Sequence, residues 1–149
     1  MKLNEMISAY NRLAYTHNYI FGYADNGKIK FVITDSKILP KICILDKASR
    51  GQGNSLRYKP NKAQKALLNM LNPIEICEQA EFEIAYENST YNRGEIFEKM
   101  VTEKFGQAWA KDNKKFTEAG DIEVNGIAYQ VKFDKATFTN EKTLASLTC

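Results

Sequence analysis

The order of apolar and polar residues predicts a β-hairpin near the end of the chain. Residues 121–132 alternate between the two classes and are interrupted by Asn-Gly, the pair that favours a two-residue hairpin turn. This turn places Asp121 opposite Gln130, and Lys132 follows on the same face because side chains alternate along a strand. The other face is apolar and ends at Phe133. The hairpin is therefore expected to carry an acid, an amide and a lysine on one side.

A helix is predicted immediately before this hairpin, over residues 92–105. Ser89 or Thr90 is available to start it, and Gly106 is expected to stop it. At about 100° per residue, one side of this helix is apolar. Its members are Ile96, Phe97, Met100, Val101 and Phe105.

Two further residues of this helix bear on how it packs. Gly94 falls inside the apolar arc, as expected where a helix backbone approaches a sheet closely. Glu98 lies at the edge of the arc and Glu95 lies well outside it. Glu98 is therefore the carboxylate expected to face the hairpin, the alternative being an ordinary solvated helix glutamate.

The remaining pattern predicts a helix, a hairpin, a strand and two more helices. These cover residues 2–16, 19–33 with a turn at Asn26-Gly27, 38–45, 61–71 and 139–147. Residues 74–86 fit either a strand or a helix. The apolar stripe of the first helix continues to His17, which predicts that this histidine is packed in the core. The fold class is α+β, a mixed β-sheet flanked by helices. Residues 1–72 are expected to be an elaboration of helix, hairpin and basic loop, and residues 73–149 the core.

The polar face of the hairpin suggests a metal site. Mg²⁺ prefers oxygen ligands and is often held by one or two carboxylates, with water and phosphate completing its shell. Asp121, the amide oxygen of Gln130 and the carbonyl of Val131 offer such oxygens. Lys132 would stand beside the ion, as a cation for a scissile phosphate or as a group that orients water. The alternative is a surface hairpin whose outer face is polar because it is exposed to solvent.

The helix and hairpin together resemble a known family. A glutamate four residues after a glycine, a strand with an aspartate, and a strand ending in Gln-x-Lys resemble the core of the PD-(D/E)XK nuclease superfamily. The resemblance covers residues 93–133 and implies a restriction-endonuclease-like core in the C-terminal half. It also implies that Glu98 joins Asp121 and Gln130 at the metal, and that Lys132 is the catalytic lysine.

The match departs from the family pattern at two positions. Gly120 stands where the family has a proline, and Gln130 stands where an acid is more usual. The second departure removes one negative charge from the metal site. It implies either weaker binding of Mg²⁺ or Mn²⁺, or a nuclease fold that no longer cuts.

The charges of the chain are separated along the sequence. Residues 28–65 contain ten Lys or Arg and two acids, a net charge of +8, whereas residues 75–103 carry −6. A basic segment is expected where a protein contacts phosphate backbones. Within it, residues 47–60 are predicted to form a flexible loop, and the residues expected to bind nucleic acid are Arg50, Arg57, Lys59 and Lys62. The alternative is a solvated basic loop without a partner.

Composition excludes several classes of protein. The hydrophobic content of 44% supports a real core, but no run of about 18 apolar residues predicts a membrane span. Cys43, Cys77 and Cys149 are widely spaced, which argues against a disulfide framework or a zinc site. We therefore expect a cytoplasmic protein with reduced thiols.

Two functional hypotheses follow. The first is a divalent-metal-dependent endonuclease that hydrolyses DNA phosphodiester bonds and works as a homodimer, because cutting two strands requires two sites. The second keeps the fold without the reaction. It describes a phage or mobile-element protein that binds DNA or inhibits a host defence nuclease, in the manner of an anti-CRISPR protein.

Overall fold

The computed structural model describes residues 1–48, 50–109 and 120–148. In this part of the chain, the larger of two β-sheets has the strand order β5-β2-β1-β7-β6. Its strands are β1 (Asn18–Asp25), β2 (Lys28–Asp35), β5 (Ile74–Glu78), β6 (Ile122–Val124) and β7 (Ile127–Phe133). The smaller sheet has the order β3-β4-β8, with β3 (Cys43–Lys47), β4 (Asn54–Tyr58) and β8 (Ala136–Asn140).

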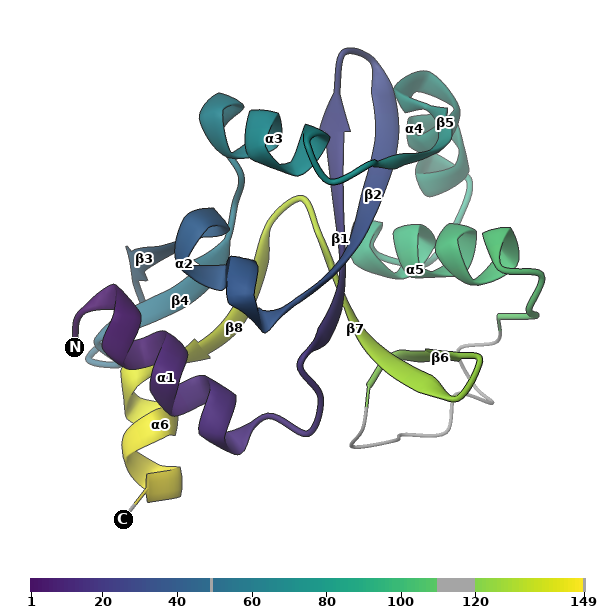
Figure 1. Cartoon of the computed structure of the whole chain (residues 1–149). Coiled ribbons are helices and arrows are strands. Elements are labelled where there is room, and N and C mark those ends of the chain that lie inside the picture. The colour runs from purple at the N-terminus through teal and green to yellow at the C-terminus, as the bar shows by residue number, and fades with distance from the viewer. Residues whose placement is uncertain (49, 110–119, 149) are drawn as a thin grey trace.

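Helices lie on both faces of the larger sheet (Figure 1). They are α1 (Leu3–Leu13), α2 (Leu39–Ile42), α3 (Lys62–Asn69), α4 (Gln79–Glu87), α5 (Arg93–Lys104) and α6 (Glu141–Thr148), and a 3-10 turn, η1 (Ser36–Ile38), precedes α2. Helices α4 and α5 pack on one face, whereas α1, α2, α3 and the smaller sheet contribute to the core on the other. The predicted α+β class, with a mixed sheet flanked by helices, is confirmed.

Both predicted hairpins are present with the expected turns. Asn26, Gly27, Asn125 and Gly126 have φ values of 50°, 75°, 53° and 80°, the left-handed conformation that a tight turn of this type requires. The register therefore pairs the residues that flank each Asn-Gly turn. The local sequence determines both hairpins.

Strand β1 joins the two halves of the chain. It pairs antiparallel with β2 and parallel with β7, so that Gly22 lies opposite Phe133. Residues 1–72 and residues 73–149 thus both contribute strands to the larger sheet. Because alternate residues of β1 point to opposite faces, Tyr19 enters one core and Ile20 enters the other.

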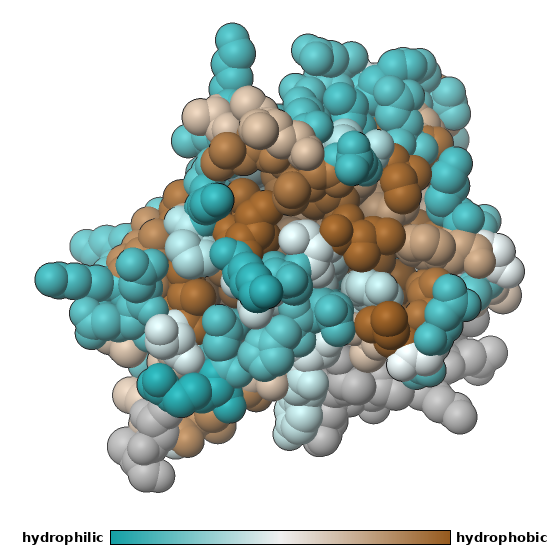
Figure 2. Space-filling view, in the orientation of Figure 1, coloured by the Kyte–Doolittle hydropathy of each residue, from teal (hydrophilic) through white to brown (hydrophobic). Residues whose placement is uncertain are grey.

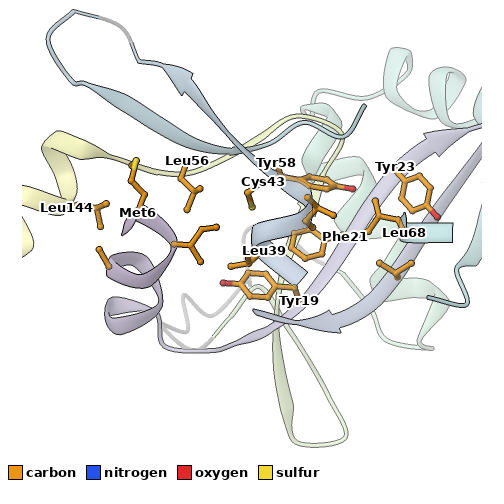
Figure 3. Packing of buried hydrophobic residues seen from close by; sticks show 14 residues of the cluster. Met6, Tyr19, Phe21, Tyr23, Leu39, Cys43, Leu56, Tyr58, Leu68 and Leu144 are labelled. Carbon is orange, nitrogen blue, oxygen red and sulfur yellow. The ribbon is translucent and has the colours of Figure 1, made fainter. Parts of the chain in front are cut away.

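The first core is rich in aromatic side chains, and Figure 3 shows how they gather between β1, α2 and the smaller sheet. Phe21 and Tyr58 lie with ring centroids 4.8 Å apart. The buried Tyr58 hydroxyl donates to the Gly22 carbonyl at 2.9 Å, and this hydrogen bond links the two sheets. A buried phenol has its polar atom satisfied in this way without interrupting the apolar contact.

The second core depends on the absence of a side chain at Gly22. The ring of Phe97 lies directly over this glycine and stacks on Phe133 with centroids 4.5 Å apart. The expectation that Gly94 marks the close approach of helix and sheet is wrong. Gly94 is exposed, and an added Cβ would meet only the Asn92 Oδ1 at 3.5 Å.

Three other predictions of local structure are wrong. Residues 38–45 begin as a 3-10 turn and α2, because Asp35 accepts from the Lys37 N–H and Pro40 occupies the first turn of the helix, where no N–H is needed. The predicted basic loop is instead largely the β3-β4 hairpin. His17 is exposed, because α1 ends at Leu13 before the apolar stripe reaches it.

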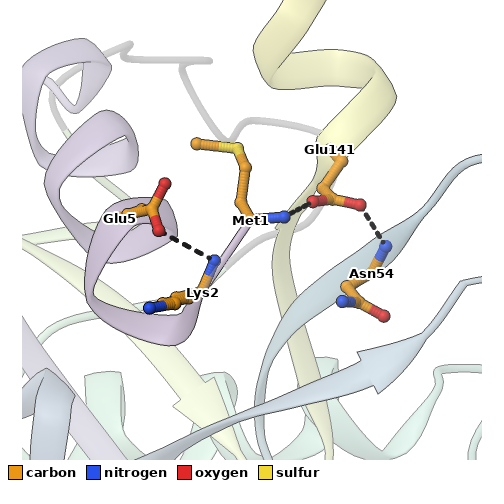
Figure 4. A network of polar contacts seen from close by, with 5 residues as sticks. All are labelled: Met1, Lys2, Glu5, Asn54 and Glu141. Atoms are coloured by element: carbon orange, nitrogen blue, oxygen red, sulfur yellow. Dashed lines mark hydrogen bonds and ion pairs between the residues drawn. The ribbon is translucent and has the colours of Figure 1, made fainter.

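The start of the final helix is also different from the prediction. Residues 136–140 form β8, and Asn140 accepts from the Thr143 N–H at the start of α6. Glu141 then accepts from the α-amino group of Met1 and from the Asn54 N–H (Figure 4). These contacts hold the N-terminus, α6 and β4 together. The ambiguous segment 74–86 is β5 followed by most of α4.

The surface in Figure 2 has apolar residues in its middle and hydrophilic residues around them, near α3 and α2. Ile33, Leu67 and Leu71 are among the partly exposed apolar side chains.

Within the described ranges, no helix has the length and apolar character needed to cross a membrane.

Candidate functional site

A pocket of about 700 Å³ lies where the start of α5 meets the end of β7 and the turn into β8. Its walls include Glu98 from α5, Asp121 from the start of the hairpin, and Val131 and Lys132 from β7. These are four of the five residues predicted for a metal-dependent active site. The fold thus brings them to one pocket from segments that are separated in sequence.

The position of Glu98 is set by the start of α5. The predicted start at Ser89 or Thr90 is wrong, since Asn92 caps the helix by accepting from the Glu95 N–H at 2.8 Å. Glu95 in turn accepts from the Asn92 N–H, which completes a capping box. Both glutamates line the pocket, but Glu98 is only 6% exposed and lies on the buried side of the helix.

Hydrogen bonds to β7 hold Asp121 in place. Its N–H donates to the Tyr129 carbonyl at 2.8 Å, and its Oδ2 accepts from the Val131 N–H at 2.9 Å. The preceding Gly120 is required by close packing, because an added Cβ would lie 2.7 Å from the Tyr129 carbonyl oxygen. The glycine at position 120 therefore has a steric reason in this chain.

Lys132 reaches toward the smaller sheet. Its Nζ donates to the Thr137 carbonyl at 3.2 Å and lies 4.8 Å from the centroid of the Phe138 ring. Burial lowers the pKa of Lys132 below its ordinary 10.5, and the nearby Asp121 carboxylate partly opposes this effect. The ammonium is thus in surroundings where electrostatic interactions are stronger than in water.

Gln130 does not contribute to the walls of the pocket. Its Oε1 accepts from the Tyr10 hydroxyl at 2.9 Å, and burial raises the pKa of that tyrosine. The strand pairing of the hairpin ends at Ile122 opposite Tyr129, one step before the expected pairing of Asp121 and Gln130. Sequence reasoning missed Tyr10, because no local pattern reports a contact between α1 and β7.

Two cations in the pocket were also missed. Arg93 donates to Glu83 at 2.8 Å, and its guanidinium lies 5.1 Å from the Phe82 centroid and 5.3 Å from that of Tyr86. The Glu83 hydrogen bond raises the pKa of Arg93. Lys135 also lines the pocket, in the turn from β7 to β8. The only sequence signal for Arg93 is its place at the first residue of a capped helix.

The four basic residues predicted to bind nucleic acid occupy different surroundings. Arg50 lies at the tip of the β3-β4 hairpin with φ 43°, and Arg57 pairs with Asp46 at 3.2 Å. Lys59 follows β4, and Lys62 is the first residue of α3. Lys59 and Lys62 are exposed.

The pocket offers oxygen donors that suit a hard cation. Across the ranges that the structure describes, no three His, Cys, Asp or Glu side chains are grouped so as to hold a metal ion. The oxygens of Glu98, Asp121 and the Val131 carbonyl remain a set compatible with Mg²⁺, which often takes only one or two carboxylates from a protein.

Replacing Lys132 should make the protein more stable. Burial penalises its charge, so Lys132→Met is expected to raise the free energy of unfolding by about 1 kcal/mol. Because the folded pKa is below the ordinary 10.5, the gain should be full below the folded pKa and shrink as pH rises from there toward 10.5. Urea unfolding across this pH range measures the gain in the free energy of unfolding. The exposed Lys99→Met is the control, and an equal gain in both variants would contradict the assignment to burial.

Comparisons of this chain with protein-family models, curated proteins and solved structures gave no match. The pocket and its side chains are therefore the basis for assigning a function.

Proposed function

We propose that this protein is a divalent-metal-dependent endonuclease that hydrolyses DNA phosphodiester bonds. The observation that carries the proposal is that Glu98, Asp121 and Lys132 all line one pocket. Two carboxylates with a lysine suit hydrolysis of a phosphodiester, in which negative charge increases on the phosphate oxygens as water attacks. The resemblance to the PD-(D/E)XK superfamily assigns these same residues to that reaction.

Glu98, Asp121 and the Val131 carbonyl would hold Mg²⁺ or Mn²⁺. The Val131 N–H already donates to Asp121, so this carboxylate is held beside Val131. When bound, the ion would supply positive charge at the phosphate and lower the pKa of a coordinated water. The preformed arrangement reduces the reorganisation that the reaction requires.

Lys132 would stabilise the negative charge that develops on the phosphate during water attack. The water oxygen forms the new bond to phosphorus, the bond to the leaving sugar oxygen breaks, and that oxygen takes up a proton. The Thr137 carbonyl and the Phe138 ring restrict the ammonium, which limits the entropy lost on binding substrate. The nearby Asp121 carboxylate favours the charged form of Lys132.

Gln130 has a supporting role in this proposal. Its amide oxygen accepts from Tyr10, so it is linked to α1 at a point beside the pocket-lining Val131. An amide in place of an acid leaves two carboxylates, Glu98 and Asp121, as the anionic metal ligands. We therefore expect binding of Mn²⁺ or Mg²⁺ that is weaker than a three-carboxylate site would give.

Cleavage of duplex DNA by this protein would require two such pockets. We propose a homodimer, in which two-fold symmetry matches the two antiparallel strands. Light scattering coupled to size-exclusion chromatography, with and without DNA, measures the oligomeric state. A monomer in both conditions would restrict the proposal to one strand at a time.

A cleavage assay tests the proposed function directly. We expect purified protein to cut plasmid or branched DNA with Mg²⁺ or Mn²⁺, EDTA to stop the reaction, and Lys132→Ala to lower the rate about a hundredfold or more. Lys99→Ala is the control, because Lys99 pairs with Glu103 on the exposed side of α5. Full activity of Lys132→Ala would contradict the proposal.

Absence of a reaction on single-stranded, duplex and branched DNA would also overturn the enzymatic assignment. Calorimetry with Mn²⁺ then separates two causes. Metal binding without cleavage would indicate a metal-binding protein that does not hydrolyse DNA, whereas absence of metal binding would favour the non-catalytic hypothesis, a protein that binds DNA or a host defence nuclease.

A further inference from the structure

The pairing of β4 with β8 brings one end of the basic hairpin to the pocket. Tyr58 at the end of β4 lies opposite Ala136 at the start of β8, and Ala136 lines the pocket. Lys59 directly follows Tyr58, and Lys135 directly precedes Ala136. The two lysines are therefore the chain neighbours of one cross-strand pair, at the rim of the pocket.

These two lysines form an exposed pair of like charges. Both side chains are exposed, and among the described residues neither has an ion pair within 4 Å. Like charges on neighbouring strand positions are unfavourable unless an anion lies between them or salt screens them. By contrast, Arg57 on the same strand is paired with Asp46. The pair at the rim is thus available to an external anion.

The surroundings of the pair indicate a chain of phosphates instead of a single small anion. The pocket itself contains the carboxylates Glu98 and Asp121, which would repel an anion unless a metal ion were bound. Two cations also line the pocket, Arg93 at the start of α5 and Lys135 in the turn after β7.

We propose that Lys59 and Lys135 form a track that binds the phosphate backbone of a nucleic-acid strand and leads it into the pocket. This inference rests on the proposed nuclease function and names the path of its substrate. The strand crosses the end of the smaller sheet at Lys59 and Lys135 and reaches the carboxylates with its next phosphates. The end of the basic hairpin near residue 50 lies at the opposite end of β4, where Asn54 pairs with Lys47.

Salt dependence of DNA binding tests this track without requiring cleavage. The probe is a short fluorescein-labelled DNA duplex, and fluorescence anisotropy is measured over a salt series with a fixed concentration of Ca²⁺, a hard cation that oxygen ligands bind. Loss of two phosphate contacts should reduce the slope of log Kd against log salt concentration by about 2. We expect that reduction for the double variant Lys59→Gln with Lys135→Gln.

A second double variant removes the same charge at the other end of the smaller sheet. Lys47 ends β3, and the N–H of Lys142 donates to the Gln52 carbonyl near the hairpin tip. Both side chains are exposed. Lys47→Gln with Lys142→Gln should leave the slope unchanged. Circular dichroism of both double variants checks that each is folded.

The outcomes separate the track from the nuclease proposal. An unchanged slope in Lys59→Gln with Lys135→Gln, an equal reduction in the control, or no DNA binding by the wild type would each overturn the track. A reduced slope in a protein that never cleaves DNA would support the track and reject the nuclease. Cleavage with an unchanged slope would retain the nuclease and reject the track.

Discussion

Asp121→Asn should reduce metal-dependent DNA cleavage at least about a hundredfold while leaving the fold intact. The substitution removes the charge but keeps an oxygen that accepts from the Val131 N–H, so the hydrogen bond that fixes this segment is retained. It also removes a carboxylate that favours the charged form of Lys132. Asparagine has nearly the same shape as aspartate. The substitution therefore weakens both the binding of the metal ion and the charge of Lys132 with little change in packing.

Single-turnover cleavage and Mn²⁺ calorimetry measure the two consequences. Glu123→Gln is the matched control, because Glu123 is an exposed carboxylate on the same hairpin and is not part of the pocket wall. We expect wild-type activity and metal affinity from the control. Wild-type cleavage by Asp121→Asn would show that the pocket is not the site of hydrolysis, even if DNA is still bound.

Gly22→Ala should lower the free energy of unfolding by about 3 kcal/mol, near the upper end for an overpacked core. Gly22 lies in β1, the middle strand of the larger sheet. An added Cβ would lie 2.7 Å or less from three carbon atoms of the Phe97 ring. That ring is fully buried and stacked on Phe133, so moving it away from an added Cβ would disturb the packing of the core.

A smaller side chain at position 97 should recover part of this loss. In urea unfolding, Phe97→Leu and Gly22→Ala are expected to cost less together than the sum of their separate costs, which a double-mutant cycle measures. Gly94→Ala is the control, because this exposed helical glycine has room for a Cβ and should gain stability by about 0.5 kcal/mol. Strict additivity of the first two changes would contradict the steric explanation.

Local signals in the sequence were enough to predict the hairpins and most helices. Asn-Gly pairs determine the turns at residues 26 and 125, because few residues adopt a positive φ twice in succession. The pattern also predicted that Glu98 is on the inner side of α5, and the structure buries it. In both cases the information lies within a few residues of the feature that it determines.

Long-range contacts could not be predicted in the same way. The parallel pairing of β7 with β1 and the hydrogen bond from Tyr10 to Gln130 join distant segments. The glycine at position 22 has no distinguishing pattern around it, since the reason for it is a ring on another element. The restriction-endonuclease-like arrangement of the core stays a prediction, as does the assignment of each site residue.

The parallel pairing of β1 with β7 has a consequence for how the chain folds during synthesis. Strand β1 can form its hairpin with β2 early, but its other edge must wait for β7, from Tyr19 at one end of the chain to Gln130 near the other. Until then, the nascent chain on the ribosome contains an incomplete sheet with an unpaired edge and exposed aromatic side chains. Contacts so distant along the chain also slow the final step. Chaperone dependence during translation should therefore be concentrated in the interval before residue 133 leaves the exit tunnel.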